Sequence, residues 1–232
     1  MELIEWKKFA DSPLSPTESV KDELRLIIAE YRRKFPSWEQ NNDARRSWFT
    51  GAKLVLSTSQ LGYIYIRDQL TDITWWKEKT IEHNMINEHV REFEIYLRYG
   101  FSNMLFTVTE ETLRSVVRSV DSTACNGGTS SFESIYTYLL KLTKKQQYLD
   151  LFNFHRLIRN TIHTNGVFRP TNHRDKSITF MGKQYNFVCG EKIDFQSYEL
   201  LLNLVSQYKV ALVDIFEADI ISSLPHVERF KW

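Results

Sequence analysis

Apolar residues recur every three or four positions along most of the chain, a spacing that predicts amphipathic α-helices. The first such run follows Ser15-Pro16-Thr17-Glu18. A serine at the N-cap, a proline at the first helical position and a glutamate three residues after the serine together form a capping box, so a helix is expected to begin there. It is expected to end at Pro36. A second helix is predicted from near Asp43, and the pattern becomes helical again from about Trp75.

Glycines and one polar loop divide these runs. Gly62 weakens the helical pattern between Leu61 and Ile66, and Gly100 predicts a break between two helices. Cys125-Asn-Gly-Gly-Thr-Ser-Ser131 is the clearest internal loop, and its serines can cap the helix that follows. The apolar spacing predicts that this next helix covers Phe132 to Leu142.

The period changes after the middle of the chain. Between Ile178 and Gly190, apolar and polar residues alternate around Gly182-Lys183, which predicts a β-hairpin. A last amphipathic helix is expected from about Gln196 to Ile221. The whole pattern predicts a mainly α fold, an up-and-down helical bundle with one β-hairpin, at about 177–190, inserted before the C-terminal helix. We expect a single helical domain over 1–232, in which 1–40 contains the capped N-terminal helix.

Composition adds limits to this prediction. Hydrophobic residues make up 42% of the chain and aromatic residues 14%, which is typical of a packed globular protein. The 30 basic residues nearly balance the 29 acidic ones, so any binding of nucleic acid must come from a local patch. The two cysteines are far apart in sequence and indicate neither a disulfide framework nor a zinc site. The charged N-terminus and the lack of a long apolar run lead us to expect a cytoplasmic protein that does not enter a membrane.

One predicted helix, from about Gln147 to Thr164, carries the most informative chemistry. At about 100° per residue, Arg159 and His163 lie one turn apart, and Arg156 lies two turns before His163 on the same stripe. A different stripe of this helix is apolar and is the expected core face; it consists of Leu151, Phe154, Ile158 and Ile162.

The sequence also predicts where this helix ends. Asn165-Gly166 suits a left-handed C-cap, because these two residue types tolerate positive φ best. The helix would therefore bury its aliphatic side and present a guanidinium, the Asn160 amide and the His163 imidazole together. Such a group of side chains suits chemistry on a phosphate.

The stretch Arg159-Asn160-Thr-Ile-His163-Thr-Asn165-Gly166 resembles the signature of the HEPN superfamily, helical bundles of prokaryotic defence and toxin systems. The hallmark of that family is an arginine, usually followed by a polar residue, with a histidine four to six residues later. Here the gap from Arg159 is three residues and the gap from Arg156 is six. Glu110-Glu-Thr-Leu-Arg114 resembles the acidic-plus-arginine helix that packs beside the motif helix in many members. The detailed resemblance covers roughly residues 100 to 166 and implies a HEPN-like core over 100–222.

The resemblance implies metal-independent cleavage of RNA, without a cofactor, by a toxin or defence protein. His163 would be the general base and Arg159 would stabilise the phosphate, while Arg156, Asn160 and Asn165 would contact the substrate. Glu110 and Arg114 would have a supporting role. The resemblance further implies a homodimer and a protein partner such as an antitoxin. The residue types fit this reaction, since imidazole can take the ribose 2′-hydroxyl proton near neutral pH and guanidinium can meet two phosphate oxygens.

Two other interpretations stay open. The first is a non-catalytic HEPN-like module that binds RNA, a nucleotide or a protein, and the altered spacing and the near-neutral charge favour it. The second is a structural helical protein in which the Arg/His face only satisfies a neighbouring acid such as Glu110. His155, next to Arg156, either flanks the site or has a packing or surface role, and a packing or surface role is expected.

Overall fold

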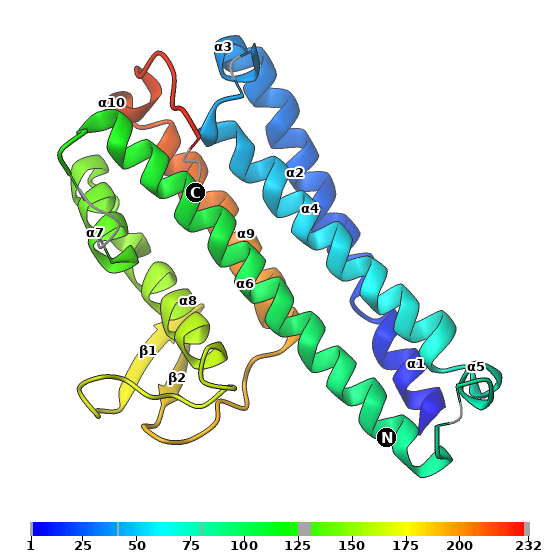
Figure 1. Ribbon diagram of the computed structural model, residues 1–232. Coiled ribbons are helices and arrows are strands. Elements are labelled where there is room, and N and C mark those ends of the chain that lie inside the picture. The colour runs from blue at the N-terminus through cyan, green and yellow to red at the C-terminus, as the bar shows by residue number, and fades with distance from the viewer. Residues whose placement is uncertain (1, 41, 80, 125–130, 230–232) are drawn as a thin grey trace.

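The chain folds into a bundle of helices with one small antiparallel sheet, shown in Figure 1. The computed structural model describes residues 2–40, 42–79, 81–124 and 131–229. In chain order the main elements are α1 (Leu3–Asp11), α2 (Leu14–Lys34), α3 (Pro36–Gln40), α4 (Ala44–Tyr65), α5 (Ile73–Lys77), α6 (Ile86–Val120), α7 (Phe132–Thr143), α8 (Leu149–Ile162), β1 (Lys176–Phe180), β2 (Lys183–Phe187), α9 (Tyr198–Phe216) and α10 (Asp219–Ser222).

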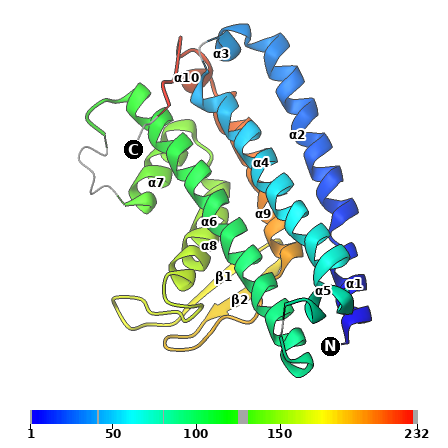
Figure 2. The same cartoon turned by 45° about the vertical axis from the view of Figure 1, so that its right-hand side comes forward.

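The long helix α6 occupies the middle of the bundle. It contacts α4 on one side and α7 and α8 on the other, and α9 also packs on it. Figures 1 and 2 show α2 and α4 running alongside α6, with the hairpin at the lower end of α8. The motif helix α8 lies beside α6, and it also contacts α7, α9 and β1. No helix among the described residues has both the length and the apolar character needed to cross a membrane.

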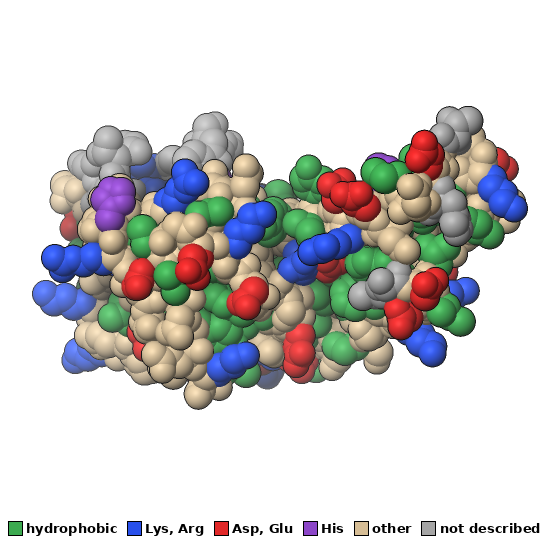
Figure 3. Space-filling model, turned by 90° about the horizontal axis from the view of Figure 1, so that it is seen from below, with side chains coloured by type: hydrophobic (Ala, Val, Ile, Leu, Met, Phe, Trp, Pro, Cys, Tyr) green, Lys and Arg blue, Asp and Glu red, His purple; other side chains and the backbone are tan. Residues whose placement is uncertain are grey.

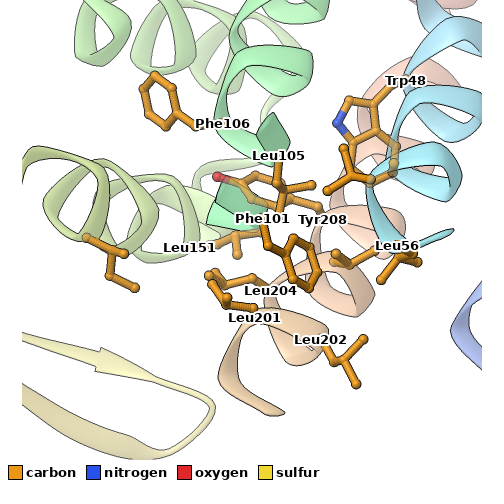
Figure 4. Close-up of a cluster of buried hydrophobic side chains, with 14 of the residues drawn as sticks. Trp48, Leu56, Phe101, Leu105, Phe106, Leu151, Leu201, Leu202, Leu204 and Tyr208 are labelled. Carbon is orange, nitrogen blue, oxygen red and sulfur yellow. The ribbon is translucent and has the colours of Figure 1, made fainter. Parts of the chain in front are cut away.

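The core forms where the apolar faces of four helices converge, as Figure 4 shows. Trp48 on α4 donates from Nε1 to the Thr109 hydroxyl at 3.0 Å, so the indole is buried without losing its hydrogen bond. Burying each large apolar side chain contributes about 1.5–3 kcal/mol. The labelled members of this cluster are Trp48, Leu56, Phe101, Leu105, Phe106, Leu151, Leu201, Leu202, Leu204 and Tyr208.

The beginning of the chain differs from the prediction. Helix α2 begins at Leu14 with Pro13 as its N-cap, so the capping box predicted at Ser15 is wrong. An additional helix, α1, precedes it, and the capping box is found there, between Glu2 and Glu5. The reason is tertiary: α1 buries Trp6 and Ala10 and packs against α4 and the following π-helical turn, Ile66–Leu70.

Two helix boundaries in the N-terminal half are confirmed. Helix α2 ends at Lys34, directly before Phe35 and Pro36. Helix α4 has Asp43 as its N-cap, and the Asp43 carboxylate accepts a hydrogen bond from the backbone N–H of Arg45 at 2.9 Å. The cap residue and the proline act locally, which is why the sequence reveals both boundaries.

Gly62 and Gly100 both lie inside continuous helices, so the break predicted at Gly100 is wrong. Gly62 lies inside α4, and a β-carbon there would be 2.5 Å from a Leu97 methyl carbon, so glycine allows α4 and α6 to approach closely. Gly100 lies in the middle of α6, which is continuous over 35 residues. The predicted start of the next helix near Trp75 is wrong, because α5 ends at Lys77 and α6 begins only at Ile86; from Ile86 onward the predicted helix is present.

The second half follows the pattern more closely. Residues 125–130 of the predicted loop lie outside the described residues, and Ser131 caps α7 by accepting from the Ser134 N–H. In the hairpin Phe180 pairs with Lys183, so the turn is at Met181-Gly182, one residue earlier than predicted. Both turn residues have positive φ, +51° and +74°, as a type I′ turn requires. The predicted last helix is divided into α9 and the short α10.

Candidate functional site

Helix α8 buries the apolar stripe that the sequence predicts. It contacts α6, α7, α9 and β1. Phe154 stacks on Phe180 and packs at a tilt against Tyr185, both in the hairpin, with ring centroids 4.7 Å apart in both pairs. The four predicted core residues of this helix are all buried: Leu151, Phe154, Ile158 and Ile162. The hairpin therefore fixes one side of α8, and the opposite side stays accessible at its C-terminal end.

The helix stops as the Asn-Gly pair predicts. Asn165 has φ +55° and Gly166 has φ +82°, and the Gly166 N–H donates to the Thr161 carbonyl at 2.8 Å. A β-carbon at Gly166 would be 2.6 Å from the Tyr99 hydroxyl of α6, so this stop also needs a glycine for space. Asn165 is exposed. Its positive φ favours asparagine at this position, so the residue type is explained without a role in binding.

Arg159, Asn160 and His163 lie together at the C-terminal end of α8. His163 is the C-cap residue and is exposed, while Arg159 is half-buried. The Arg159 guanidinium lies 5.0 Å from the centroid of the Phe106 ring on α6, and one of its nitrogens is 3.4 Å from the Asn160 amide oxygen. The Phe106 ring thus packs against the Arg159 guanidinium. The sequence does not indicate this contact, because Phe106 lies in an ordinary apolar run of α6.

The electrostatic state of His163 suits a proton acceptor. Its partial burial and, second, the positive charge of Arg159 lower the pKa of His163 below the usual imidazole value of 6.5. The imidazole is therefore mostly neutral at pH 7. Among the described residues, neither of its ring nitrogens has a hydrogen-bond partner, so both are open to a ligand.

Arg156 does not join this group. Its guanidinium forms an ion pair with Glu133 of α7 at 3.2 Å and also donates to the Tyr136 hydroxyl at 3.2 Å and to the Asn153 side-chain oxygen at 3.3 Å. These contacts tie α8 to α7. The structure therefore gives Arg156 a structural position and leaves Arg159 as the arginine beside His163.

Glu110 and Arg114 form a pair on α6. The guanidinium of Arg114 meets the Glu110 carboxylate at 2.5 Å and 3.1 Å, and both side chains are largely buried. Glu110 lies one helical turn after Phe106, the residue whose ring packs against Arg159. Within the described part of the chain, no hydrogen bond or ion pair joins Glu110 to Arg159 or His163, which argues against the structural interpretation of the Arg/His face.

His155 packs in the core and does not flank the site; of the packing and surface roles that we expected, it has the packing role. It is fully buried, its Nε2 donates to the Ser102 carbonyl at 3.3 Å, and its Nδ1 accepts from the Tyr208 hydroxyl at 3.0 Å. Burial lowers the pKa of His155 to about 4. His155 is thus neutral in the folded protein and separate from the exposed group.

Acidification is expected to destabilise the fold through His155. The unfolded chain takes up this proton at about pH 6.5 and the folded protein only near pH 4, so the unfolded state holds more protons between these values. The free energy of unfolding should fall by about 3 kcal/mol as the pH falls through this window. Urea unfolding of the wild type and of His155→Leu measures it. The variant should be less stable than the wild type at neutral pH, but its free energy of unfolding should fall less on acidification. Parallel curves of unfolding free energy against pH for the two proteins would contradict the role of His155.

The stretch of sequence that includes the α8 end is rich in basic residues. From Arg156 to Lys176 the chain has five Lys and Arg residues and one acidic residue, Asp175. On the face seen from below in Figure 3, basic side chains lie among acidic ones. The basic charge is therefore a local feature of this segment.

The site residues do not line the larger clefts. One cleft of about 630 Å³ lies between α4 and α6, and another of about 770 Å³ lies where α2, α6 and α9 approach each other. Neither is lined by Arg159 or His163. Across the described ranges, no three His, Cys, Asp or Glu side chains gather in a way that could hold a metal ion.

Comparison with other proteins adds no assignment. No protein-family model, no curated protein and no solved structure matches this chain. What the α8 end can do therefore follows from its own residues: an exposed neutral imidazole beside a guanidinium and an amide, a set suited to holding a phosphate and removing a nearby proton.

Proposed function

We propose that this protein is a metal-independent endoribonuclease, with His163 as general base and Arg159 as the group that stabilises the phosphate. One observation carries the proposal: an imidazole with a lowered pKa and no bonding partner among the described residues lies beside Arg159 at an accessible helix end. Neutral imidazole is the protonation state that a general base needs near pH 7. The resemblance of this helix to the HEPN motif supports the same function in a toxin or defence system.

The reaction follows from these two groups. His163 takes the proton of the ribose 2′-hydroxyl, and the 2′-oxygen then forms a bond to the adjacent phosphorus. The bond from phosphorus to the 5′-oxygen breaks, and that oxygen takes a proton from water. Arg159 donates hydrogen bonds to the phosphate oxygens while their negative charge grows. The products are a 2′,3′-cyclic phosphate and a 5′-hydroxyl.

The product ends give the test of this mechanism. Purified protein is incubated with mixed RNA, and the fragments are treated with a phosphatase that removes only non-cyclic 3′-phosphates, before and after mild acid opening of the ring. We expect fragments that resist the phosphatase until the ring is opened. Fragments with 5′-phosphate and 3′-hydroxyl ends would show a different reaction and would overturn the proposal.

The rate of cleavage should depend on pH through His163. Because its pKa is lowered, the base stays deprotonated at more acidic pH, and the acidic limb of kcat/KM should have an apparent pKa below 6.5. In Arg159→Gln the limb should move towards higher pH, since the positive charge that disfavours the imidazolium is gone. Single-turnover rates across the acidic range measure both. A wild-type limb at or above the usual imidazole value would contradict the role of His163.

A two-fold homodimer is part of the proposal. Its basis is the resemblance, since HEPN nucleases commonly form one cleft from two motif helices, and a second copy would double the local positive charge at the site. The same resemblance implies a protein partner such as an antitoxin. Sedimentation at micromolar concentration is expected to show a dimer. A monomer alone, together with an active enzyme, would show that one α8 end is sufficient.

A non-catalytic binding module is the second candidate. The position of Arg156 favours it, because this arginine has the six-residue spacing to His163 but is engaged with α7. In that case the α8 end would hold RNA through Arg159 and Asn160 without cleaving it. Binding of an RNA oligonucleotide that is lost in Arg159→Ala, with no cleavage by the wild type, would support this candidate.

A further inference from the structure

An apolar groove lies between α4 and α6, the two helices that run side by side in Figures 1 and 2. Its volume is about 630 Å³, a size that is typical of sites for small molecules. Three large apolar side chains line this α4/α6 groove and are exposed to solvent: Leu54 at 65%, Tyr96 at 72% and Met104 at 55%. Exposed apolar side chains that gather in one groove indicate that something binds there.

Gly100 lies in the lining of the groove, on α6 between Tyr96 and Met104, and is exposed. A β-carbon added at Gly100 would meet no atom within 4 Å, so packing inside the described molecule does not require a glycine. Glycine also weakens the interior of a helix relative to other residues. Its effect here is to keep the space between Tyr96 and Met104 open, and a larger side chain at this position would fill that space.

The middle of the groove is mainly apolar. Serine and threonine residues complete its walls, and at least two of their hydroxyls are bonded to the backbone of their own helix. Ser47 donates to the Asp43 carbonyl at 2.9 Å, and Thr107 donates to the Asn103 carbonyl at 2.9 Å. The apolar lining residues are Leu54, Val55, Leu97, Phe101, Met104 and Val108, besides Tyr96. This lining favours an alkyl chain over a polar ligand.

The charged residues of the groove lie at one end. Helices α4 and α6 run antiparallel in Figure 1, so Arg46 in the first turn of α4 and Glu111 in the last third of α6 lie at the same end. Arg229 lines this end too and pairs with the Glu111 carboxylate at 3.0 Å, and the Arg229 side chain is 45% exposed. A guanidinium has several N–H donors, so Arg229 can hold a second carboxylate while it keeps this pair.

We infer that the α4/α6 groove binds a free single-chain fatty acid. The alkyl chain lies along the apolar middle, and the carboxylate accepts hydrogen bonds from Arg229. From Tyr96 to Val108, α6 extends over about 18 Å at its rise per residue, so the groove can hold a chain of the length of laurate. This site is separate from the α8 end and does not depend on the proposed RNA cleavage.

The test compares amphiphiles below their micellar concentrations in calorimetric titration. We expect the wild-type protein to bind one laurate per chain with micromolar affinity. Octanoate should bind more weakly by a factor of about ten or more, because its shorter chain buries fewer CH₂ groups. Dodecyltrimethylammonium has an alkyl chain of similar length but a cationic head group, and it should also bind more weakly by a factor of about ten, because its head group lies beside arginines.

Gly100→Leu separates the groove from the rest of the molecule. The leucine side chain should abolish laurate binding by filling the middle of the groove. The melting temperature without ligand should equal or exceed that of the wild type, because leucine favours a helix more than glycine and the position is open. Gly100→Ala is the matched control and should bind laurate with an affinity close to that of the wild type.

Arg229→Gln tests the head group. It should weaken laurate binding about fivefold, as expected for an ion pair near the surface, and should not weaken the binding of dodecyltrimethylammonium. An equal loss for both amphiphiles would show that Arg229 does not hold the carboxylate and would overturn the inference.

Three other results would overturn the inference. The first is a wild type that binds no laurate or binds both head groups equally. The second is a Gly100→Leu variant that binds laurate as the wild type does, or that does not fold, since the position would then not be open. The third comes from sedimentation: a wild-type dimer that Gly100→Leu dissociates, together with no laurate binding, would make the groove an interface between copies of the chain.

Discussion

His163→Ala is expected to abolish RNA cleavage and to leave the free energy of unfolding nearly unchanged. Loss of a general base typically costs a factor of about a hundred or more in rate. Stability should be retained because His163 is exposed and its ring has no hydrogen-bond partner among the described residues. Single-turnover cleavage and urea unfolding of the same preparation measure the two effects.

Arg159→Ala should lower the rate by a similar factor, about a hundredfold, since it removes charge stabilisation that is in place before the reaction. His173→Asn, at an exposed histidine with positive φ, and Arg33→Ala, at an exposed position on α2, are matched controls and should cleave at the wild-type rate. Cleavage by His163→Ala at the wild-type rate would exclude His163 as the base.

Arg156→Ala should distinguish the role of Arg156 from that of Arg159. Because Arg156 bonds Glu133, Tyr136 and Asn153, its loss should reduce stability more than the cleavage rate. The reverse result, normal stability with a strongly reduced rate, would make Arg156 the functional arginine and would place the six-residue spacing at the centre of the site.

The largest loss of stability is expected from Arg45→Met. Arg45 and Asp43 form an ion pair in which neither side chain is exposed, and the guanidinium also donates to the backbone carbonyls of Ile221 at 2.6 Å and Leu224 at 3.1 Å. It lies 3.9 Å from the centroid of the Trp38 ring. Removing one partner leaves the Asp43 charge buried, and breaking such a pair costs about 3–5 kcal/mol.

Urea unfolding checks this value. The control is Arg25→Met, because Arg25 also pairs with acids, Glu18 and Asp22, but on the solvent-exposed surface of α2. Its effect should be a small fraction of the Arg45 effect. Equal losses in the two variants would show that the Asp43–Arg45 pair does not hold the C-terminal segment to α4.

Features that depend on a few neighbouring residues were predictable from the sequence. The Asn165-Gly166 stop, the Asp43 cap and the end of α2 before Pro36 all result from local backbone preferences. The predicted break at Gly100 was wrong because a glycine costs a helix only about 1 kcal/mol, and packing of the long α6 against its neighbours outweighs that cost.

The details of the candidate site depended on contacts between distant elements. Arg156 and Arg159 share one helical face with His163, so spacing alone could not choose between them. The choice comes from Glu133 and Tyr136 on α7, which bind Arg156.

Cleavage of RNA in the presence of a chelator tests the central claim most directly. Wild-type protein and His163→Ala, prepared in the same way, are incubated with mixed RNA at neutral pH with and without EDTA. We predict that the wild type cleaves equally well in both conditions and that the variant does not cleave, because the proton acceptor is the His163 imidazole. Loss of wild-type cleavage in EDTA that is restored by Mg²⁺ or Mn²⁺, or equal cleavage by the variant, would contradict it.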